Sequence, residues 1–260
     1  MRRHIAIAVA VASLLTGCST VPYTNRSQLV LISESEEAQL GAQAFQQATK
    51  GKRIVRGTRA AAQVEDVGRR LAAVSGQRDF HWQFALLEGK DVNAFALPGG
   101  KTAVYTGLLP VAVDTNGLAV VMGHEIAHAI ARHGAERMSQ GVLVELGGAV
   151  VGAAAGQNAA LAMAAYGLGS QLGIMLPFSR SHESEADRIG LILMARAGYD
   201  PRGALAFWDR MEAQQRGGSP PEFLSTHPGY ETRRKRISDA MPEALQYYAV
   251  APRAPVVPLE

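Results

Sequence analysis

Apolar and polar positions along this chain repeat mainly with the period of helices. Apolar spacing and capping residues, including a Ser33-Glu34-Ser35-Glu36 capping box, predict helices at 33–50, 58–75, 114–138, 181–197, 201–216 and 231–241. Three shorter runs read as strands, with a Pro98-Gly99-Gly100-Lys101 turn between the last two; they cover 81–87, 92–97 and 102–106. The pattern predicts an α+β fold that is mostly helical, with one small β-sheet.

An apolar stretch rich in Ala and Gly interrupts this amphipathic pattern between Arg137 and Arg180, where Glu145 is the only charged residue. It can form two helices packed on each other, or a hairpin that touches a membrane surface. Polar pairs at 157–158 and 170–171 break the apolar runs before either reaches the ~20 residues that a span needs. We therefore expect packed helices. The sequence leaves open whether the stretch gates a cleft, fills the core or forms an oligomer.

The first residues have the pattern of a secretory signal peptide: Arg2 and Arg3, then an apolar run, then Leu15-Thr16-Gly17-Cys18. The last four are similar to a bacterial lipobox, in which cleavage precedes the cysteine and its sulfur receives a diacylglycerol. The alternative is cleavage at another small residue, with Cys18 incidental. Ser19 rather than Asp follows the cysteine, which by resemblance to sorted bacterial lipoproteins favours the outer membrane. We expect a signal peptide at 1–17, a tether at 18–30, the folded domain at 31–245 and a disordered Pro-rich tail at 246–260.

Composition narrows the function classes. The 260 residues carry a net charge of +3, and the signal peptide accounts for two of these charges. The basic turn Arg233-Arg234-Lys235-Arg236 has no interleaved aromatics and reads as a solvated helix face, so nucleic acid is not an expected partner. The glycines at 167, 169 and 173 lack the spacing and preceding strand of a dinucleotide site. A single cysteine excludes an intrachain disulfide framework and a cysteine-based zinc cluster.

The strongest chemical pattern lies in the predicted helix 114–138 and reads His124-Glu125-Ile126-Ala127-His128. Residues four apart on a helix are separated by about 40° around its axis, so both imidazoles can reach one tetrahedral zinc ion. Glu125 then lies where a carboxylate can take a proton from the attacking water. The motif predicts one Zn²⁺ per chain, bound by His124 and His128.

A third ligand from the same helix is not expected. The position six residues beyond His128, where metzincins carry a histidine, is Gly134. His133 is five residues from His128, about 140° around a continuous helix, and cannot share the ion. We expect it at the surface or against a ligand side chain.

A carboxylate from a later helix offers the other solution. Glu183 and Asp187 are four residues apart and share a helix face. Glu183 can bind zinc, and Asp187 can accept the N–H of a ligand histidine and fix its tautomer. Glu185 points away from that face and is expected outside the metal's ligand set. The alternative is a solvated charged face without a metal role.

These motifs together resemble the HtpX and CAAX prenyl protease family of gluzincin metallopeptidases, and more narrowly its bacterial envelope lipoproteins and the mitochondrial inner-membrane quality-control protease. The resemblance covers roughly residues 33–241. It rests on the zinc motif and on four segments in the family's order, at 93–100, 106–109, 178–190 and 225–228. It implies a zincin-like (minigluzincin) domain whose β-sheet lies beside the zinc helix. The zinc ligands would be His124, His128 and Glu183, with Glu125 as general base.

Two parts of the site stay open. His227 is a candidate oxyanion donor or fourth zinc ligand, with Arg233 and Tyr230 as further donor candidates; alternatively His227 only fixes a turn. The segment containing Asn93, Phe95 and Ala96 is either a sheet edge that pairs with an extended substrate or a structural hairpin.

The expected function is a zinc-dependent endopeptidase of the bacterial cell envelope that hydrolyses misfolded or stalled envelope proteins. We expect it on the periplasmic face of the outer membrane, lipid-anchored at Cys18, with protein or peptide substrates. Oligomers and outer-membrane assembly partners fit the same placement. The alternative is an envelope chaperone or assembly factor on a metallopeptidase scaffold.

Overall fold

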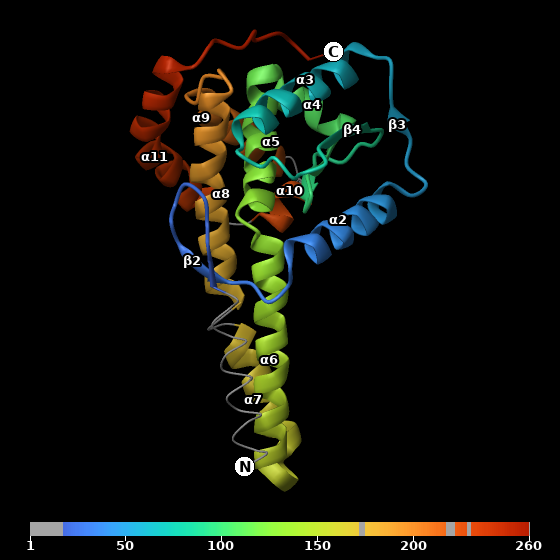
Figure 1. The fold of residues 1–260 in the computed structure, drawn as a ribbon, viewed down its shortest axis with the longest axis vertical. Coiled ribbons are helices and arrows are strands. Elements are labelled where there is room, and N and C mark those ends of the chain that lie inside the picture. The colour runs from blue at the N-terminus through green and yellow to red at the C-terminus, as the bar shows by residue number, and fades with distance from the viewer. Residues whose placement is uncertain (1–17, 172–174, 217–221, 228–229, 260) are drawn as a thin grey trace.

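The helix α5, Thr115–Ile130, lies at the centre of the fold, and all of its residues are buried. The computed structural model describes residues 18–171, 175–216, 222–227 and 230–259. As predicted, α5 begins at an Asp114 cap, whose Oδ1 accepts the backbone N–H of Gly117 at 2.8 Å. Helices α3 (Arg59–Val74) and α8 (Leu176–Arg196) both pack on α5 and also contact each other, and α3 crosses α5 near its start (Figure 1).

The other helices surround this centre. Ser33 and Glu36 form the predicted capping box of α2, and Thr58 caps α3. Helix α11 packs against both α8 and α9. The remaining helical segments are α2 (Glu34–Thr49), η1 (Thr106–Leu108), α4 (Leu109–Ala112), α6 (His133–Ala155), η2 (Gly156–Asn158), α7 (Ala159–Ser170), α9 (Gly203–Arg216), α10 (Glu222–Thr226) and α11 (Tyr230–Val250).

A four-stranded sheet in the order β3-β4-β6-β5 covers the α3 side of α5. Strands β4 and β6 are parallel, and the other two neighbour pairs are antiparallel. Within the described residues β5 pairs with β6 alone, so its other edge is free of strand partners. The sheet strands are β3 (Ile54–Val55), β4 (Gln83–Leu87), β5 (Ala94–Leu97) and β6 (Lys101–Tyr105). The mostly helical α+β class and the sheet beside the zinc helix are confirmed.

Two glycines set the distance between α5 and α8. A Cβ placed on Gly190 of α8 would lie 2.8 Å from the backbone N of His124, and one on Gly123 would lie 3.0 Å from the carbonyl oxygen of Gly190. The first distance is shorter than real Cβ contacts and the second is tighter than most of them, so the two helices meet backbone to backbone. This contact places the face of α8 that carries Glu183 and Asp187 against the two histidines of α5.

The predicted helix 114–138 is wrong in one respect, because it breaks at Arg132. This residue has a φ of 56°, in the left-handed region, and α6 starts at His133. The conformation costs about 1 kcal/mol or more for a residue with a Cβ. Contacts of the Arg132 side chain with the carboxylate of Glu37 and the carbonyl of Ile32 offset that cost.

The tether predicted at 18–30 is an ordered part of the domain. It contains a two-stranded antiparallel hairpin of β1 (Cys18–Thr20) and β2 (Ser27–Leu29). Val21 is fully buried in the main core, and Arg26 binds carboxylates of α6 and α8. The expectation failed because a polar, turn-rich composition does not reveal these long-range contacts. The predicted signal peptide at 1–17 lies outside the described residues.

The C-terminal segment also differs from the expectation. Helix α11 runs to Val250 rather than ending near residue 241, and residues 251–259 pack along the domain instead of being disordered. The N–H of Thr115 donates to Val257, that of Leu259 to Val113, and that of Ala254 to Gly198. Prolines lack a backbone donor, but their carbonyls and their neighbours still pair with the start of α5.

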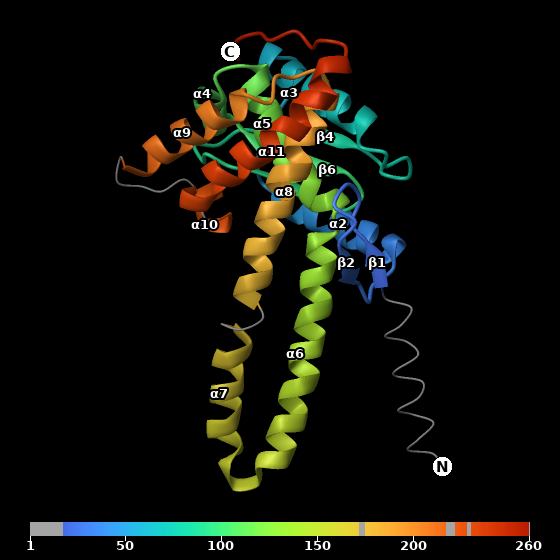
Figure 2. The ribbon, with the colours of Figure 1, turned by 90° about the vertical axis from the view of Figure 1, so that its left-hand side faces the viewer.

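The apolar stretch forms two helices that pack on each other, α6 and α7, and together they project from the domain as a long hairpin (Figure 2). We name this element, residues 141–170, the α6–α7 arm. The prediction of paired helices is confirmed, but their outer faces are exposed rather than packed in a core.

Candidate metal centre

Four donor atoms converge at the α5–α8 contact. They come from His124 and His128 of α5, Glu183 of α8, and His227 directly after α10, and all lie within 4.8 Å of one another. His124 Nε2 is 3.2 Å from His128 Nε2 and 3.4 Å from Glu183 Oε2, and His128 Nε2 is 3.3 Å from Glu183 Oε1. His227 Nδ1 lies 3.3 Å from His124 Nε2 and 3.0 Å from Glu183 Oε1.

These separations fit a zinc ion. Zn–N bonds of 2.0–2.1 Å in a tetrahedron require neighbouring ligand atoms about 3.3–3.4 Å apart. Imidazole nitrogens and a carboxylate are ordinary zinc ligands, and a buried, closely spaced set of this kind is costly without a cation to hold it. The sequence-predicted ligands His124, His128 and Glu183 therefore lie together, and His227 supplies a fourth donor.

The electrostatics of the cluster also favour a cation. Burial lowers the pKa of His128 well below its ordinary value, which keeps the imidazole in its neutral, metal-binding form. Burial acts in the same direction on His124, but Asp187 and Glu183 outweigh it and raise its pKa to about 9. Burial would raise the pKa of Glu183, yet the three histidines hold it far below its usual range. The negative charge that favours a proton on His124 equally favours a metal ion beside it.

Glu125 lies next to this cluster without joining it. One carboxylate oxygen accepts the backbone N–H of Ala96 at 3.3 Å, and the other is 3.3 Å from His227 Nε2. Burial raises the pKa of Glu125, while His227 and His124 oppose that shift. A carboxylate with a raised pKa is a stronger base than an exposed glutamate, which suits it to accept a proton from water.

Asp187 of α8 and Arg233 of α11 contact the ligand side chains and hold them in place. Asp187 Oδ1 lies 3.0 Å from His124 Nδ1, as expected for the group that fixes that histidine's tautomer. Arg233 donates to Asp187 at 3.0 Å and to Glu183 at 2.6 Å, and its guanidinium lies 4.1 Å over the ring of Trp208.

The prediction of a solvated face is therefore wrong for Arg233, which is only 1% exposed. One sequence pattern could have revealed it: Arg233 lies one helical turn before Ile237, on the buried face of α11. Its engagement with two carboxylates also removes it as an oxyanion donor. The side chain of Tyr230, the other donor candidate, lies outside the described residues.

A second buried network supports His128 from the opposite side. The break at Arg132 returns His133 to the cluster, so that its Nδ1 lies 2.8 Å from His128 Nδ1. His133 Nε2 in turn lies 2.9 Å from Glu185. His133 is fully buried and does not join the metal's donor set, which leaves it against a ligand side chain. Glu185 lies outside that set, as predicted.

Arg26 closes this second network. It donates to Glu136 at 2.7–2.8 Å and to Glu185 at 3.0 Å. Burial would raise the pKa of both carboxyl groups, but Arg26 with His182 or His133 lowers each to about 2. The N-terminal hairpin is thus bound to the residues that orient His128.

We predict that Arg26→Met lowers the free energy of unfolding at pH 7 by about 2–3 kcal/mol, less than a fully buried pair because Arg26 is 25% exposed. Carboxylates whose folded-state pKa is depressed stabilise the fold above their ordinary pKa of 4.5 and lose that contribution as the pH falls toward 2. The difference from wild type therefore shrinks between pH 5 and pH 3, as measured by urea unfolding.

Arg69→Met is the matched control, because Arg69 pairs with Glu65 on the exposed surface of α3. It should change stability by less than about 0.5 kcal/mol at any pH. An Arg26→Met protein as stable as the control would show that the second network does not stabilise the fold.

The edge strand β5 lies beside Glu125, as the contact with the Ala96 amide shows. Phe95 points to the opposite face of the sheet, where its ring packs near Phe45 and Tyr105 at centroid distances of 6.2 and 6.4 Å. Asn93 precedes the strand and accepts the N–H of Ala94 through its own side chain.

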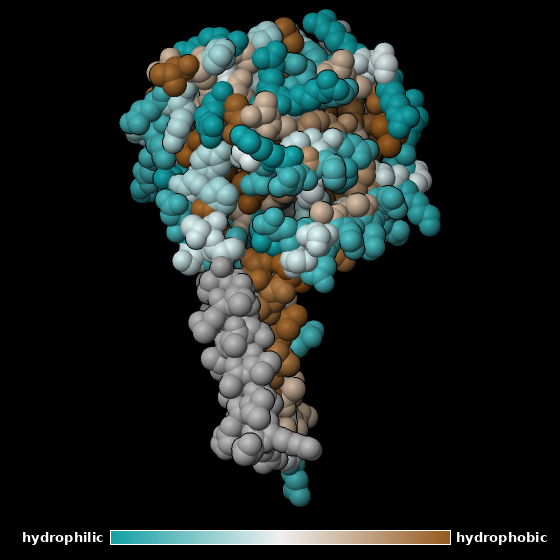
Figure 3. All heavy atoms as spheres, viewed as in Figure 1, coloured by the Kyte–Doolittle hydropathy of each residue, from teal (hydrophilic) through white to brown (hydrophobic). Residues whose placement is uncertain are grey.

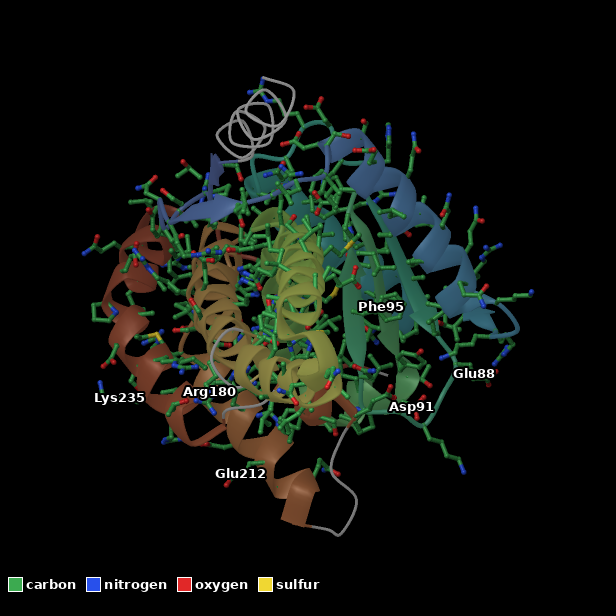
Figure 4. All side chains as sticks on the ribbon, turned by 90° about the horizontal axis from the view of Figure 1, so that it is seen from below. Glu88, Asp91, Phe95, Arg180, Glu212 and Lys235 are labelled. Carbon is green, nitrogen blue, oxygen red and sulfur yellow. The ribbon has the colours of Figure 1, made fainter. Side chains whose placement is uncertain are left out.

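Figure 4 shows the molecule along the axis of the α6–α7 arm, with Phe95 on one side of the arm and Arg180 on the other.

The helix crossing, the sheet edge and the donor set define a metallopeptidase domain of the HExxH type. The sequence model described as peptidase family M48 matches residues 58–241. The chain belongs to this family, which confirms the resemblance found in its motifs.

Two relatives illustrate the family's range. The chain is 40% identical over 189 residues to the mitochondrial metalloendopeptidase OMA1 of Schizosaccharomyces pombe, covering 70% of this chain and 53% of that protein. It is 29% identical over 238 residues to the beta-barrel assembly-enhancing protease of Escherichia coli, covering 87% of this chain and 49% of that one. The chain spans about half the length of each of these relatives.

Proposed function

We propose that this chain is a zinc-dependent endopeptidase that hydrolyses protein substrates in the bacterial cell envelope. The observation that carries the proposal is the spacing of the donor atoms from His124, His128 and Glu183, with the Glu125 carboxylate directly beside them. A zinc ion bound there would polarise the scissile carbonyl. It would also lower the pKa of water, so that the water can lose a proton and attack the carbonyl carbon.

The chain's own residues supply the proton transfers. The Glu125 carboxylate takes a proton from the attacking water as the new C–O bond forms. It then gives that proton to the amide nitrogen as the C–N bond breaks, which releases a carboxylic acid and an amine, and the proton of the acid passes to the amine to give a carboxylate and an ammonium group. Asp187 and His133 act on the ligands rather than on the substrate: they hold His124 and His128 in the orientation and tautomer that leave each Nε2 facing the metal.

His227 occupies the position that water and substrate would need. Its Nδ1 completes the set of four donors, and a closed tetrahedral site has no open position for catalysis. We therefore assign His227 as the fourth ligand of a resting state, and it must leave before hydrolysis. The ring of His227 stacks on Phe223 at a centroid distance of 4.5 Å, and its backbone N–H donates to the carbonyl of that residue. Its departure therefore involves the end of α10.

The free edge of β5 is the proposed substrate platform. A substrate strand added to this edge would place its backbone next to Glu125, because the Ala96 amide already lies at that carboxylate. Recognition through main-chain hydrogen bonds suits an enzyme that acts on many unfolded segments. Ala96 lies on this edge and Asn93 directly precedes the strand, whereas the ring of Phe95 packs on the opposite face of the sheet.

The cellular placement is proposed from the sequence and from relatives. The lipobox-like pattern ending at Cys18 supports a lipid anchor at the periplasmic face of the outer membrane. The relative in Escherichia coli is named for enhancing β-barrel assembly, which supports envelope proteins as substrates. The mitochondrial relatives are metalloendopeptidases by name, which supports the reaction but not the compartment.

The test is metal content and proteolysis on the purified chain. We expect one zinc per chain, cleavage of β-casein, loss of cleavage after treatment with 1,10-phenanthroline, and recovery when zinc is added back. Protein that contains no stoichiometric zinc, or casein cleavage that resists chelation, would contradict the proposal.

His227→Ala is the informative comparison within that experiment. Three ligands remain, so the variant should keep its zinc, and casein cleavage should match or exceed the wild-type rate because the fourth position is open. Loss of zinc would make His227 a permanent structural ligand. Retained zinc with much slower cleavage would instead make it an oxyanion donor.

A further inference from the structure

The α6–α7 arm exposes large apolar side chains, and their contact with water is unfavourable. Its large aliphatic side chains point outward, with exposed fractions of 60% for Leu146, 70% for Val150, 75% for Leu161 and 63% for Leu168. Figure 3 shows the apolar colour running along the arm below the domain. A continuous exposed patch of this kind marks an interaction site.

The composition of the arm matches a lipid environment. The helical segment 133–170 contains an 18-residue window with a mean hydropathy of 1.3, which is high enough for a membrane, and only 17% of that window is buried. A core helix of a soluble protein with this composition would be mostly buried. Glu145, near the domain end of the arm, is its only charged residue.

In a water-soluble helix pair, large apolar side chains lie between the helices and polar side chains face outward. The arm has the opposite arrangement. The helices meet through small residues: Gly147 faces Tyr166, and Gly148 and Gly152 face Met163. The hydroxyl of Tyr166 donates to the carbonyl of Val144 at 3.1 Å, so the polar contact also lies inside the pair. Small residues and hydrogen bonds between helices, with large aliphatics outside, are typical of helices packed in a membrane.

The direction of the exposed side chains favours lipid over a second copy of the chain. Val142, Leu146 and Val150 form one stripe at four-residue spacing, whereas Leu143 lies about 100° away around α6, and Leu161 and Leu168 come from α7. A protein partner covers one face of a helix pair. Apolar residues around most of the circumference are satisfied by acyl chains on all sides.

The geometry also suits entry from one side. Both ends of the arm join the same domain, and from Gly141 to Ala155 helix α6 rises about 21 Å. This is less than the ~30 Å hydrocarbon core, so the arm can enter the bilayer from one side and return without reaching the opposite surface. Figure 2 shows β1 and β2 beside the domain end of α6, and the N–H of Leu31 donates to Ser139 of α6 at 2.8 Å. The strand that begins at Cys18 therefore lies on the side from which the arm projects.

We propose that the α6–α7 arm inserts into a lipid bilayer and holds the metallopeptidase domain against the membrane surface. The insertion needs no acylation of Cys18 and does not depend on the enzyme's activity. Because α6 starts at His133, which contacts His128, the metal centre lies about 12 Å along that helix from the start of the arm. The arm would thus keep the site close to the membrane.

A fluorescent thiol probe on the arm tests the proposal. Val150→Cys in the full processed chain is labelled with NBD and mixed with vesicles of phosphatidylethanolamine and phosphatidylglycerol that carry nitroxide-labelled acyl chains. We expect a blue shift and strong quenching of this probe. The matched variant is Ala73→Cys: Ala73 is exposed on α3, a helix at the end of the domain away from the arm (Figure 1), and its probe should keep its emission. Wild-type protein, whose single cysteine is Cys18, gives the labelling blank.

Adding Leu146→Glu and Leu161→Glu to the Val150→Cys protein separates the arm from any lipid anchor. These carboxylates should abolish the blue shift and the quenching, even where an acyl chain keeps the protein on the vesicle. Zinc content should not change, because neither residue touches the metal centre.

Two results would overturn the proposal. A probe at residue 150 that stays in water when vesicles are present would show that the arm does not insert. A probe that is shifted without vesicles, in a protein that light scattering shows to be dimeric, and that nitroxide lipids do not quench, would assign the arm to contacts between copies of the chain.

Discussion

Replacing Glu125 by Gln lowers the rate of peptide hydrolysis by about 10²- to 10⁴-fold and leaves one zinc ion bound. The amide has nearly the shape of the carboxylate and can still accept the backbone N–H of Ala96. It has no basic oxygen pair with which to take a proton from water at neutral pH. The zinc ligands are untouched, since Glu125 stands beside the donor set rather than in it.

Zinc content by mass spectrometry and kcat with β-casein, measured on the same preparations, check this result. Wild-type chain treated with chelator provides the reference for a protein without metal. A Glu125→Gln protein that cleaves casein within a few-fold of wild type would exclude this residue as the base. If the variant lost hydrolysis but still supported envelope assembly in cells, the scaffold would have a chaperone function separate from its chemistry.

Glu183→Ala removes a ligand and a structural anchor together. Zinc should fall below one per chain, and casein cleavage should be lost with it. Arg233, only 1% exposed, would keep Asp187 but lose its 2.6 Å bond to Glu183. A buried guanidinium with incomplete pairing is costly, so the free energy of unfolding should fall by about 3 kcal/mol.

Glu183→Gln separates the two effects. The amide oxygen can still accept from Arg233, so most of the stability should return in urea unfolding. A neutral amide binds zinc poorly, so metal binding should stay weak. An alanine variant that holds one zinc with wild-type affinity would show that Glu183 is not a ligand.

Local chemistry made much of this fold predictable. Ser33, Thr58 and Asp114 cap helices at the predicted starts because each cap depends on residues within one turn. The central ligands were predictable for the same reason. His124 and His128 share one helix face, Glu183 and Asp187 share another, and both relations follow from helix geometry alone.

Features that depend on distant contacts could not be read from the sequence. The left-handed turn at Arg132 is held by Glu37 and Ile32, about a hundred residues earlier. It also brings His133 against His128, which is one of the two places expected for it, although the angle behind that expectation assumed a continuous helix. Arg233 was predicted to be solvated because only its charge was considered. It lies one helical turn before Ile237, on the buried face of α11. The segments at 18–30 and 251–259 look unstructured by composition and gain their order from partners far along the chain.

The backbone contact of α5 and α8 at Gly123 and Gly190 bears on how the protein tolerates mutation. Where side chains separate two helices, each substitution in the interface alters the helix spacing. It therefore also alters the distances between the functional side chains that the two helices carry. Here the main chains touch directly, so the separation of His124 from Glu183 is insulated from changes in the surrounding core. Substitutions elsewhere in the core should therefore move these two side chains little, whereas a side chain at Gly190 would meet the backbone of His124 directly.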